Sequence, residues 1–216
     1  MNALGKRIEQ VAHDPKSLAV MGAVKRAHAG HRLCHHKVRA LYALREAAGQ
    51  NISSYLEIGV HNGTSMSYVL LCDSQIRAVG IDLFERTNYA DRLALRDIKR
   101  RLDSLNKFGH SVRLIKGDSH DSGTYAELGQ SKFDLIFIDG DHSYEGVKND
   151  FGRILGLLSP GGIVAFDDNN DAQTNRGVRK FVLELVGSGL YDTYDFVDRW
   201  HPGTFKNGIT FLRQRV

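Results

Sequence analysis

Short apolar runs alternate with longer amphipathic stretches over most of the chain. The apolar runs are rich in Ile and Val, which is typical of buried strands. We predict strands at Tyr55–Val60, Arg77–Leu83, Ser111–Lys116, Phe133–Asp139 and Gly162–Phe166. The stretches with helical spacing predict helices at Thr64–Leu71, Asp91–Leu105, Ser122–Leu128, Tyr144–Leu158 and Ala172–Val186. A crossover helix after each strand predicts a parallel sheet with helices on both faces.

The two ends of the chain depart from this alternation. Residues 1 to about 50 have a one-face apolar pattern, which predicts a helical cap within the same domain as residues 51–216. At the other end, Tyr191–Arg199 and Gly208–Arg213 have strand character with no helix between them, which predicts an antiparallel hairpin. The predicted fold class is therefore α/β, a Rossmann-like doubly wound sheet with an N-terminal helical cap.

Composition fits a single globular domain. The 216 residues are 42% hydrophobic and 25% charged, with three prolines and no long tract typical of a linker. The two cysteines, Cys34 and Cys72, have no CxxC spacing, so neither a disulfide framework nor a zinc cluster is predicted. This cysteine usage fits a reducing, cytoplasmic setting. No apolar run has the length of a signal peptide or a membrane span, so we expect a soluble protein without a membrane partner.

Charge gives weaker information about partners. The net charge of +4 comes from scattered basic residues, and no aromatic-rich basic motif of the usual RNA-binding modules occurs. We therefore expect a small-molecule acceptor substrate rather than nucleic acid, and a positive charge would also suit an acidic small molecule. Assembly into a homo-oligomer stays open.

Polar residues gather where the first predicted strand ends. The turn there contains Glu57, Gly59, Asn62, Gly63 and Ser65. Its two glycines let the backbone approach a ligand at a helix N-terminus. The Gly59-x-x-x-Gly63 spacing is not the GxGxxG dinucleotide fingerprint, which argues against a nicotinamide-dependent dehydrogenase. Glu57 instead suits a positively charged group, such as the ammonium of S-adenosylmethionine (SAM).

The next two strand ends extend this pattern. Asp82 closes the second strand, about twenty residues beyond the glycine turn, where a carboxylate can accept hydrogen bonds from both ribose hydroxyls. Asp118 and Ser119 follow the third strand, where a carboxylate and a backbone N–H can bind adenine. Each aspartate has an alternative role in capping a helix or stabilising a turn. The ordered series nevertheless favours a nucleoside site.

Five segments of the chain resemble the class I SAM-dependent methyltransferases, from about Tyr55 to the C-terminus: YLEIGVHNGTS, VGID, KGDS, FDLIFIDGDHSYEGVKNDF and LSPGGIVAFDD. The last two look like the subfamily that includes macrolide-sugar and aminocoumarin-sugar O-methyltransferases and cephalosporin hydroxylase-like proteins. The resemblance implies a seven-stranded sheet with the last strand antiparallel. It also implies SAM as cofactor and methylation of a hydroxyl on a sugar or phenol.

The same resemblance implies a metal site. Several members of the subfamily hold Mg²⁺ with one carboxylate after the fourth strand and two after the fifth, and these positions match Asp139, Asp167 and Asp168. Hard oxygen ligands of this kind suit Mg²⁺ or Mn²⁺. Asp141 is an alternative to Asp139 as the metal ligand. We also expect Asp139 to contact the cofactor.

A general base is implied three residues further on. His142 matches a catalytic histidine of the macrolide-sugar enzymes, and an imidazole can take the proton of a hydroxyl near neutral pH. Together with Asp139 it forms the predicted catalytic pair. In the alternative interpretation, Asp139 and Asp141 stabilise a tight turn, and His142 helps to cap the helix that begins near Tyr144.

Several further residues stay without a firm role. The cluster His28, His31, His35 and His36 is expected to face solvent or the edge of the substrate site. Loop residues that could shape the acceptor pocket are Asn88, Tyr89, Arg199, Trp200 and His201. Two alternatives to metal-assisted O-methylation stay open: a metal-independent O- or N-methyltransferase, and a non-catalytic SAM-binding module.

Overall fold

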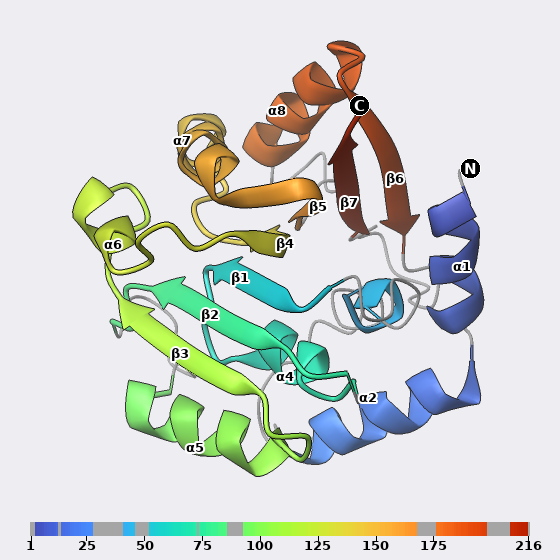
Figure 1. Ribbon diagram of the computed structural model, residues 1–216, viewed down its shortest axis with the longest axis vertical. Coiled ribbons are helices and arrows are strands. Elements are labelled where there is room, and N and C mark those ends of the chain that lie inside the picture. Colours follow the sequence, from blue (N-terminus) through green and yellow to red (C-terminus); the bar gives the residue numbers. More distant parts are fainter. Residues whose placement is uncertain are drawn as a thin grey trace.

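The computed structural model describes residues 3–12, 14–27, 41–45, 52–72, 74–85, 93–167, 176–197 and 208–215. Its centre is one sheet with the strands β1 Ser54–Ile58, β2 Arg77–Asp82, β3 Ser111–Lys116, β4 Phe133–Ile138, β5 Leu158–Phe166, β6 Tyr191–Val197 and β7 Gly208–Gln214. Their spatial order is β3-β2-β1-β4-β5-β7-β6 (Figure 1). The order reverses between β1 and β4, which is the switch point where ligands bind in open α/β sheets.

Strand direction agrees with the predicted architecture. The pairs β1–β2, β1–β4, β2–β3 and β4–β5 are parallel. Strand β7 is antiparallel to both β5 and β6, and β6 and β7 form the predicted terminal hairpin. The prediction of a seven-stranded Rossmann-like sheet with an antiparallel last strand is therefore confirmed.

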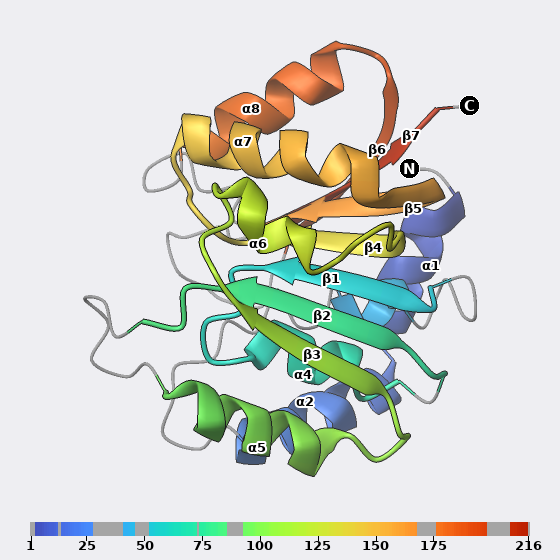
Figure 2. The same cartoon turned by 60° about the vertical axis from the view of Figure 1, so that its left-hand side comes forward.

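Helices cover both faces of the sheet. Their bounds are α1 Ala3–Ala12, α2 Pro15–Ala27, α4 Thr64–Val69, α5 Leu95–Leu105, α6 Ser122–Ala126, α7 Tyr144–Ile154 and α8 Arg176–Gly187, and residues 41–45 are also helical. Figure 2 shows α2, α4 and α5 on one side of the sheet and α6, α7 and α8 on the other. Within the described residues, no helix is long and apolar enough to cross a membrane.

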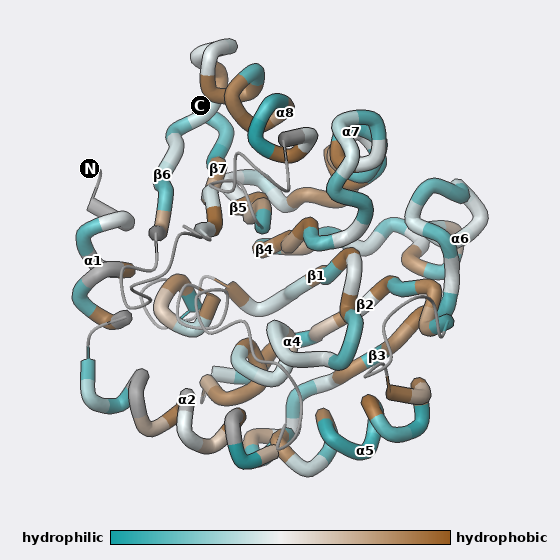
Figure 3. Tube along the Cα trace, turned by 180° about the vertical axis from the view of Figure 1, so that it is seen from behind, coloured by the Kyte–Doolittle hydropathy of each residue, from teal (hydrophilic) through white to brown (hydrophobic). Residues whose placement is uncertain are grey.

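Each face of the sheet has its own apolar core. One core combines alternate residues of the strands, such as Tyr55 and Phe137, with Ile98 and Leu102 of α5. The other packs α7 and α8 against the opposite face. Figure 3 shows that α5 alternates between hydrophilic and hydrophobic positions along its length, as a helix with one buried face must.

Three element boundaries differ from prediction by more than two residues within the part of the chain that the structure describes. Helix α5 begins at Leu95 rather than Asp91, since Ala94 is extended and provides no side-chain cap. The helix predicted to reach Leu158 ends at Ile154 in a short 3₁₀ turn, Leu155–Leu157. Strand β5 begins at Leu158 rather than Gly162, because an irregularity in its pairing with β4 lets the strand continue through Gly161 at φ 73°.

Candidate functional site

The carboxyl ends of the parallel strands are tied together in series. The ladder continues one residue beyond each strand: Gly59 N–H donates to Ile81 O at 2.9 Å, Asp139 N–H to Ile58 O at 2.9 Å, and Asp167 N–H to Ile138 O at 3.1 Å. Neighbouring strands lie about 4.8 Å apart. The predicted cofactor and metal residues therefore lie next to one another along the carboxyl edge of the sheet.

Glu57 is the innermost predicted residue of this edge. Its side chain is 0% exposed, and the Tyr55 hydroxyl donates a 2.9 Å hydrogen bond to Oε2. Burial raises the pKa of that hydroxyl well above its usual value, and the charge of Glu57 raises it further. The charges of Asp139 and Asp167 act on Tyr55 in the same direction. The three carboxylates therefore share one electrostatic environment.

The glycine turn after β1 has the backbone that its sequence predicts. Gly59 and Gly63 have φ angles of 88° and 76°, in the left-handed region that favours glycine. A Cβ on Gly59 would lie 2.0 Å from the carbonyl oxygen of Asp139, so no other residue fits there. Gly63 precedes α4, whose first turn contains the buried Ser65.

Two further predicted cofactor residues hold loops in place. Asn62 is buried, and its Oδ1 accepts a 2.8 Å hydrogen bond from the Leu93 N–H. Asp82 accepts two backbone hydrogen bonds, from His61 N–H to Oδ2 at 2.8 Å and from Phe84 N–H to Oδ1 at 2.7 Å. Both donors have positive φ, 50° at His61 and 47° at Phe84. Asp82 therefore stabilises the turns after β1 and β2 from between them.

The turn after β3 carries the predicted adenine residues. The exposed Asp118 accepts a 2.8 Å hydrogen bond from His120 N–H, which is the turn-stabilising role considered for it, and Ser119 is half-buried beside it. Gly117 N–H donates to Asp82 O at 3.0 Å, which ties the start of this turn to β2. At its other end, Asp121 caps α6.

Asp139 and His142 lie together after β4. His142 Nε2 is 3.2 Å from Asp139 Oδ1, and the His142 side chain is 33% exposed. Asp141 points instead to the start of α7, where its two oxygens accept hydrogen bonds from the N–H and hydroxyl of Ser143. Ser143 in turn caps the helix through Gly146 N–H. The capping role considered for His142 thus belongs to Ser143.

Only part of the predicted metal site is within the described residues. Asp167 follows β5 with 1% of its surface exposed, next to the strand end that carries Asp139. Asp168 lies outside the described residues. Among the residues that are described, no three His, Cys, Asp or Glu side chains are grouped so that they could hold a metal ion.

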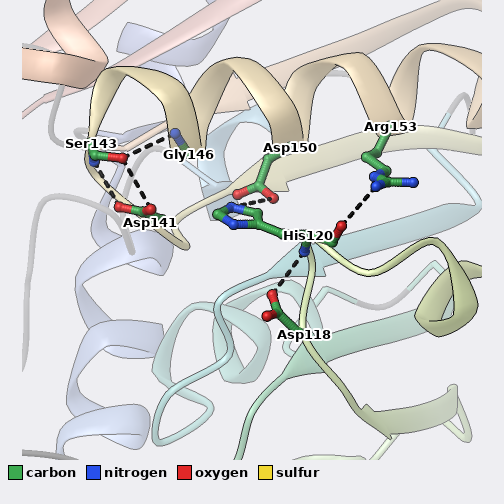
Figure 4. A network of polar contacts seen from close by, with 7 residues as sticks. All are labelled: Asp118, His120, Asp141, Ser143, Gly146, Asp150 and Arg153. Carbon is green, nitrogen blue, oxygen red and sulfur yellow. Dashed lines mark hydrogen bonds and ion pairs between the residues drawn. The ribbon is translucent and has the colours of Figure 1, made fainter.

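Sequence reasoning missed one acidic residue near this edge. Asp150 on α7 is 0% exposed, and its Oδ1 lies 3.7 Å from His120 Nε2 (Figure 4). Burial raises the pKa of Asp150 to about 6, although the Ser119 side chain and the charge of His120 act in the opposite direction. The signal was present in the sequence, because Asp150 occupies the same helical face as the apolar Val147 and Ile154.

The remaining predicted residues cannot be placed. The N-terminal histidines, Cys34 and the loop residues Asn88, Tyr89, Arg199, Trp200 and His201 lie outside the described residues. Cys72 is described, and it is buried as a free thiol.

The sheet order, the antiparallel β7 and the polar strand ends together define a class I methyltransferase fold. The sequence profile of a family described as a methyltransferase domain matches residues 56–169, more than half of the chain. The chain therefore belongs to this methyltransferase family, and the prediction of a class I methyltransferase domain is confirmed.

Individual proteins are similar to this chain in sequence or in fold. The uncharacterized protein R132 of Acanthamoeba polyphaga mimivirus is 30% identical over 148 residues, which cover 66% of this chain and 65% of the viral protein. This chain therefore spans less than two thirds of that relative. An O-methyltransferase from Bacillus cereus in complex with SAH has a TM-score of 0.65 at 20% identity, over 99% of this chain and 98% of that one. TomG of Streptomyces achromogenes, an O-methyltransferase involved in tomaymycin synthesis and solved with SAM, has a TM-score of 0.62 at 19% identity over the full length of both chains.

Proposed function

We propose that this protein transfers the methyl group of SAM to a hydroxyl of a small molecule. The observation that carries the proposal is the placement of Glu57, Asp82 and Asp118 at the ends of three adjacent strands. Neighbouring strand ends at this spacing suit the amino acid, ribose and adenine parts of one ligand. The structural relatives solved with SAM and SAH give independent support.

Each of the three carboxylates has a distinct task in this proposal. Glu57, held by Tyr55, binds the ammonium group through charge-assisted hydrogen bonds. Asp82 accepts the ribose hydroxyls, and Asp118 with the backbone of Ser119 binds adenine. SAM, when bound, supplies a methyl group on a sulfonium, which is intrinsically electrophilic. The protein therefore has to align the acceptor oxygen with that methyl group and exclude water.

His142 is the proposed general base. If Nε2 carries the proton shared with Asp139, Nδ1 is left as the acceptor for the hydroxyl proton. The negative charge of Asp139 then stabilises the imidazolium that results. The partial exposure of His142 leaves its ring accessible to an acceptor.

The donor set at the β4 and β5 ends fits a hard divalent cation. Asp139 and Asp167 offer carboxylate oxygens from adjacent strand ends, and Asp168 follows directly in the sequence. The engagement of Asp141 with Ser143 supports Asp139 as the ligand. Mg²⁺ or Mn²⁺, when bound, would increase the acidity of the acceptor hydroxyl. We propose in addition that the protein belongs to the subfamily that includes the macrolide-sugar and aminocoumarin-sugar O-methyltransferases.

We also propose that residues 1–50 cap the acceptor site within the same domain. Ile8 and Leu41 pack into the same apolar core as Tyr55, which supports a single folding unit. Helix α2 packs against α4 and α5. An N-terminal segment held in this way can contribute side chains to the acceptor pocket.

A metal-independent methyltransferase is the second candidate. It is favoured by the 3.2 Å contact between His142 Nε2 and Asp139 Oδ1, which offers a base and its carboxylate partner without a metal ion. The variant Asp167→Ala separates the two candidates. Full methyl transfer by this variant, or by the unchanged protein after rigorous chelation, would refute the metal site and support a metal-independent methyltransferase.

Calorimetry with SAM and SAH tests the cofactor half of the proposal. We expect binding in the micromolar range, weakened at least tenfold by Glu57→Gln, since a charge-assisted hydrogen bond contributes about 1.5–3 kcal/mol. Glu145→Gln removes an exposed carboxylate from α7 and serves as the matched control. Absence of binding at millimolar SAM would refute the proposal. Methyl-labelled SAM, offered with a panel of sugars and phenols, tests the transfer itself.

A further inference from the structure

Asp150 approaches, from helix α7, the strand ends that carry the predicted cofactor residues. It belongs to α7, yet its carboxylate lies between the turn after β3 and the turn after β4 (Figure 4). On one side, Oδ1 is 3.7 Å from His120 Nε2. On the other, a Cβ on Gly140 would lie 2.9 Å from Oδ2, so the carboxylate packs directly against the backbone beside Asp139.

Helix α7 holds the turn after β3 at a second point. Arg153, three residues after Asp150 on α7, donates a 2.7 Å hydrogen bond from a guanidinium nitrogen to the carbonyl oxygen of His120. His120 N–H donates in turn to Asp118 Oδ1. Ring, carbonyl and N–H of His120 are thus all engaged, and one of these contacts leads to a predicted adenine residue (Figure 4).

The buried carboxylate is costly for the fold. Burial raises the pKa of Asp150, so ionisation near neutral pH opposes folding. An apolar or amide side chain would fill the same position on the buried face of α7 at less cost. A residue that destabilises the fold while contacting a ligand-binding turn is a candidate for a functional role.

We propose that Asp150 is a positioning residue for adenine recognition, acting through His120 on the turn that carries Asp118 and Ser119. The inference rests on the proposed SAM-binding function. Its ligand is the 6-aminopurine end of SAM or SAH, because the proposed function assigns that end to Asp118 and Ser119, on the turn that His120 contacts. Asp150 therefore governs how well the protein distinguishes adenine from other purines, and not how it binds the amino acid end.

The test compares two probes in calorimetry, SAH and S-inosylhomocysteine, which differ at the 6-position of the purine and in the proton that the 6-oxo base carries on N1. The unchanged protein should bind SAH more tightly than S-inosylhomocysteine. Asp150→Asn should reduce this preference on the order of tenfold, because displacing Asp118 removes its hydrogen bond with the 6-amino group, and one hydrogen bond to a charged group accounts for about that factor. Glu145→Gln, the same chemical change on the same helix, should leave the preference unchanged.

Two further measurements separate positioning from a general structural role. The urea midpoint of Asp150→Asn should equal or exceed that of the unchanged protein. His120→Ala should reduce the preference similarly, and the double variant should lose no more than either single one, because the two residues act in series. A structural defect alone would weaken both probes by the same factor and leave their ratio intact.

The outcomes are distinct. SAH binding with an unaltered ratio in Asp150→Asn would overturn this inference and leave the proposed function standing. Binding of neither probe by the unchanged protein would overturn both.

Discussion

Replacing Asp82 should destabilise the protein even without cofactor. Its carboxylate accepts hydrogen bonds from His61 N–H and Phe84 N–H, at 2.8 and 2.7 Å. Hydrogen bonds to a charged acceptor contribute about 1.5–3 kcal/mol each. Because Asp82 is 9% exposed and water can partly replace it, the lower value applies. Two such bonds give about 3 kcal/mol for Asp82→Ala, and about half of that for Asp82→Asn, which keeps one acceptor oxygen.

Urea unfolding followed by circular dichroism measures this loss in cofactor-free protein. A loss of about 3 kcal/mol in a domain of this size should also lower Tm by about 6–12 °C. Asp103→Ala removes an exposed carboxylate from α5 and should change stability by less than about 0.5 kcal/mol. Equal midpoints for the Asp82 and Asp103 variants would refute the reasoning, because Asp82 would then serve the ligand alone.

Three further predictions concern the same edge. Gly59→Ala, whose Cβ would lie 2.0 Å from a carbonyl oxygen, should cost several kcal/mol in urea unfolding, whereas Gly129→Ala, with φ 56° and open space, should cost only about 1 kcal/mol. Burial raises the pKa of Asp150 from 3.8 to about 6, so its ionisation should destabilise the unchanged protein by about 3 kcal/mol relative to Asp150→Asn as pH rises from 4 to above 6. Urea titrations of both proteins across that range, in the presence of a chelator, measure this difference. Tyr55→Phe removes the donor to Glu57 Oε2 and should cost about 1–3 kcal/mol in urea unfolding while weakening SAH binding in calorimetry.

The positions of the strand ends could be predicted from sequence, because the signals for them are local. Strand β3 has the predicted bounds at both ends, and β1, β2 and β4 differ from prediction by one or two residues. In a parallel sheet the residue that closes each apolar run must emerge at the same edge. Glu57, Asp82 and Asp139 therefore follow from the pattern of the chain without any knowledge of packing.

Contacts between distant elements could not be predicted in this way. Nothing near His120 in the sequence indicates that a helix about thirty residues further on supplies its partners. The start of α5 was missed for a related reason, since Ala94 gives no capping signal and Leu93 is instead held by Asn62 across a loop. Such contacts depend on the tertiary arrangement and not on any local preference.

The capping and cofactor roles considered for the strand-end aspartates are not exclusive. A carboxylate offers about four acceptor sites, and Asp118 accepts one hydrogen bond, from His120 N–H, that shapes its own turn. Asp82 likewise shapes two turns, with one backbone hydrogen bond to each of its oxygens. Asp141 differs, since both of its oxygens bind Ser143 at the start of α7. The hydrogen bonds by which Asp82 and Asp118 stabilise their turns thus also hold each carboxylate in a fixed position in the absence of a ligand. In the proposed function, such a site would bind SAM without first ordering its loops, which would lower the entropic cost of binding.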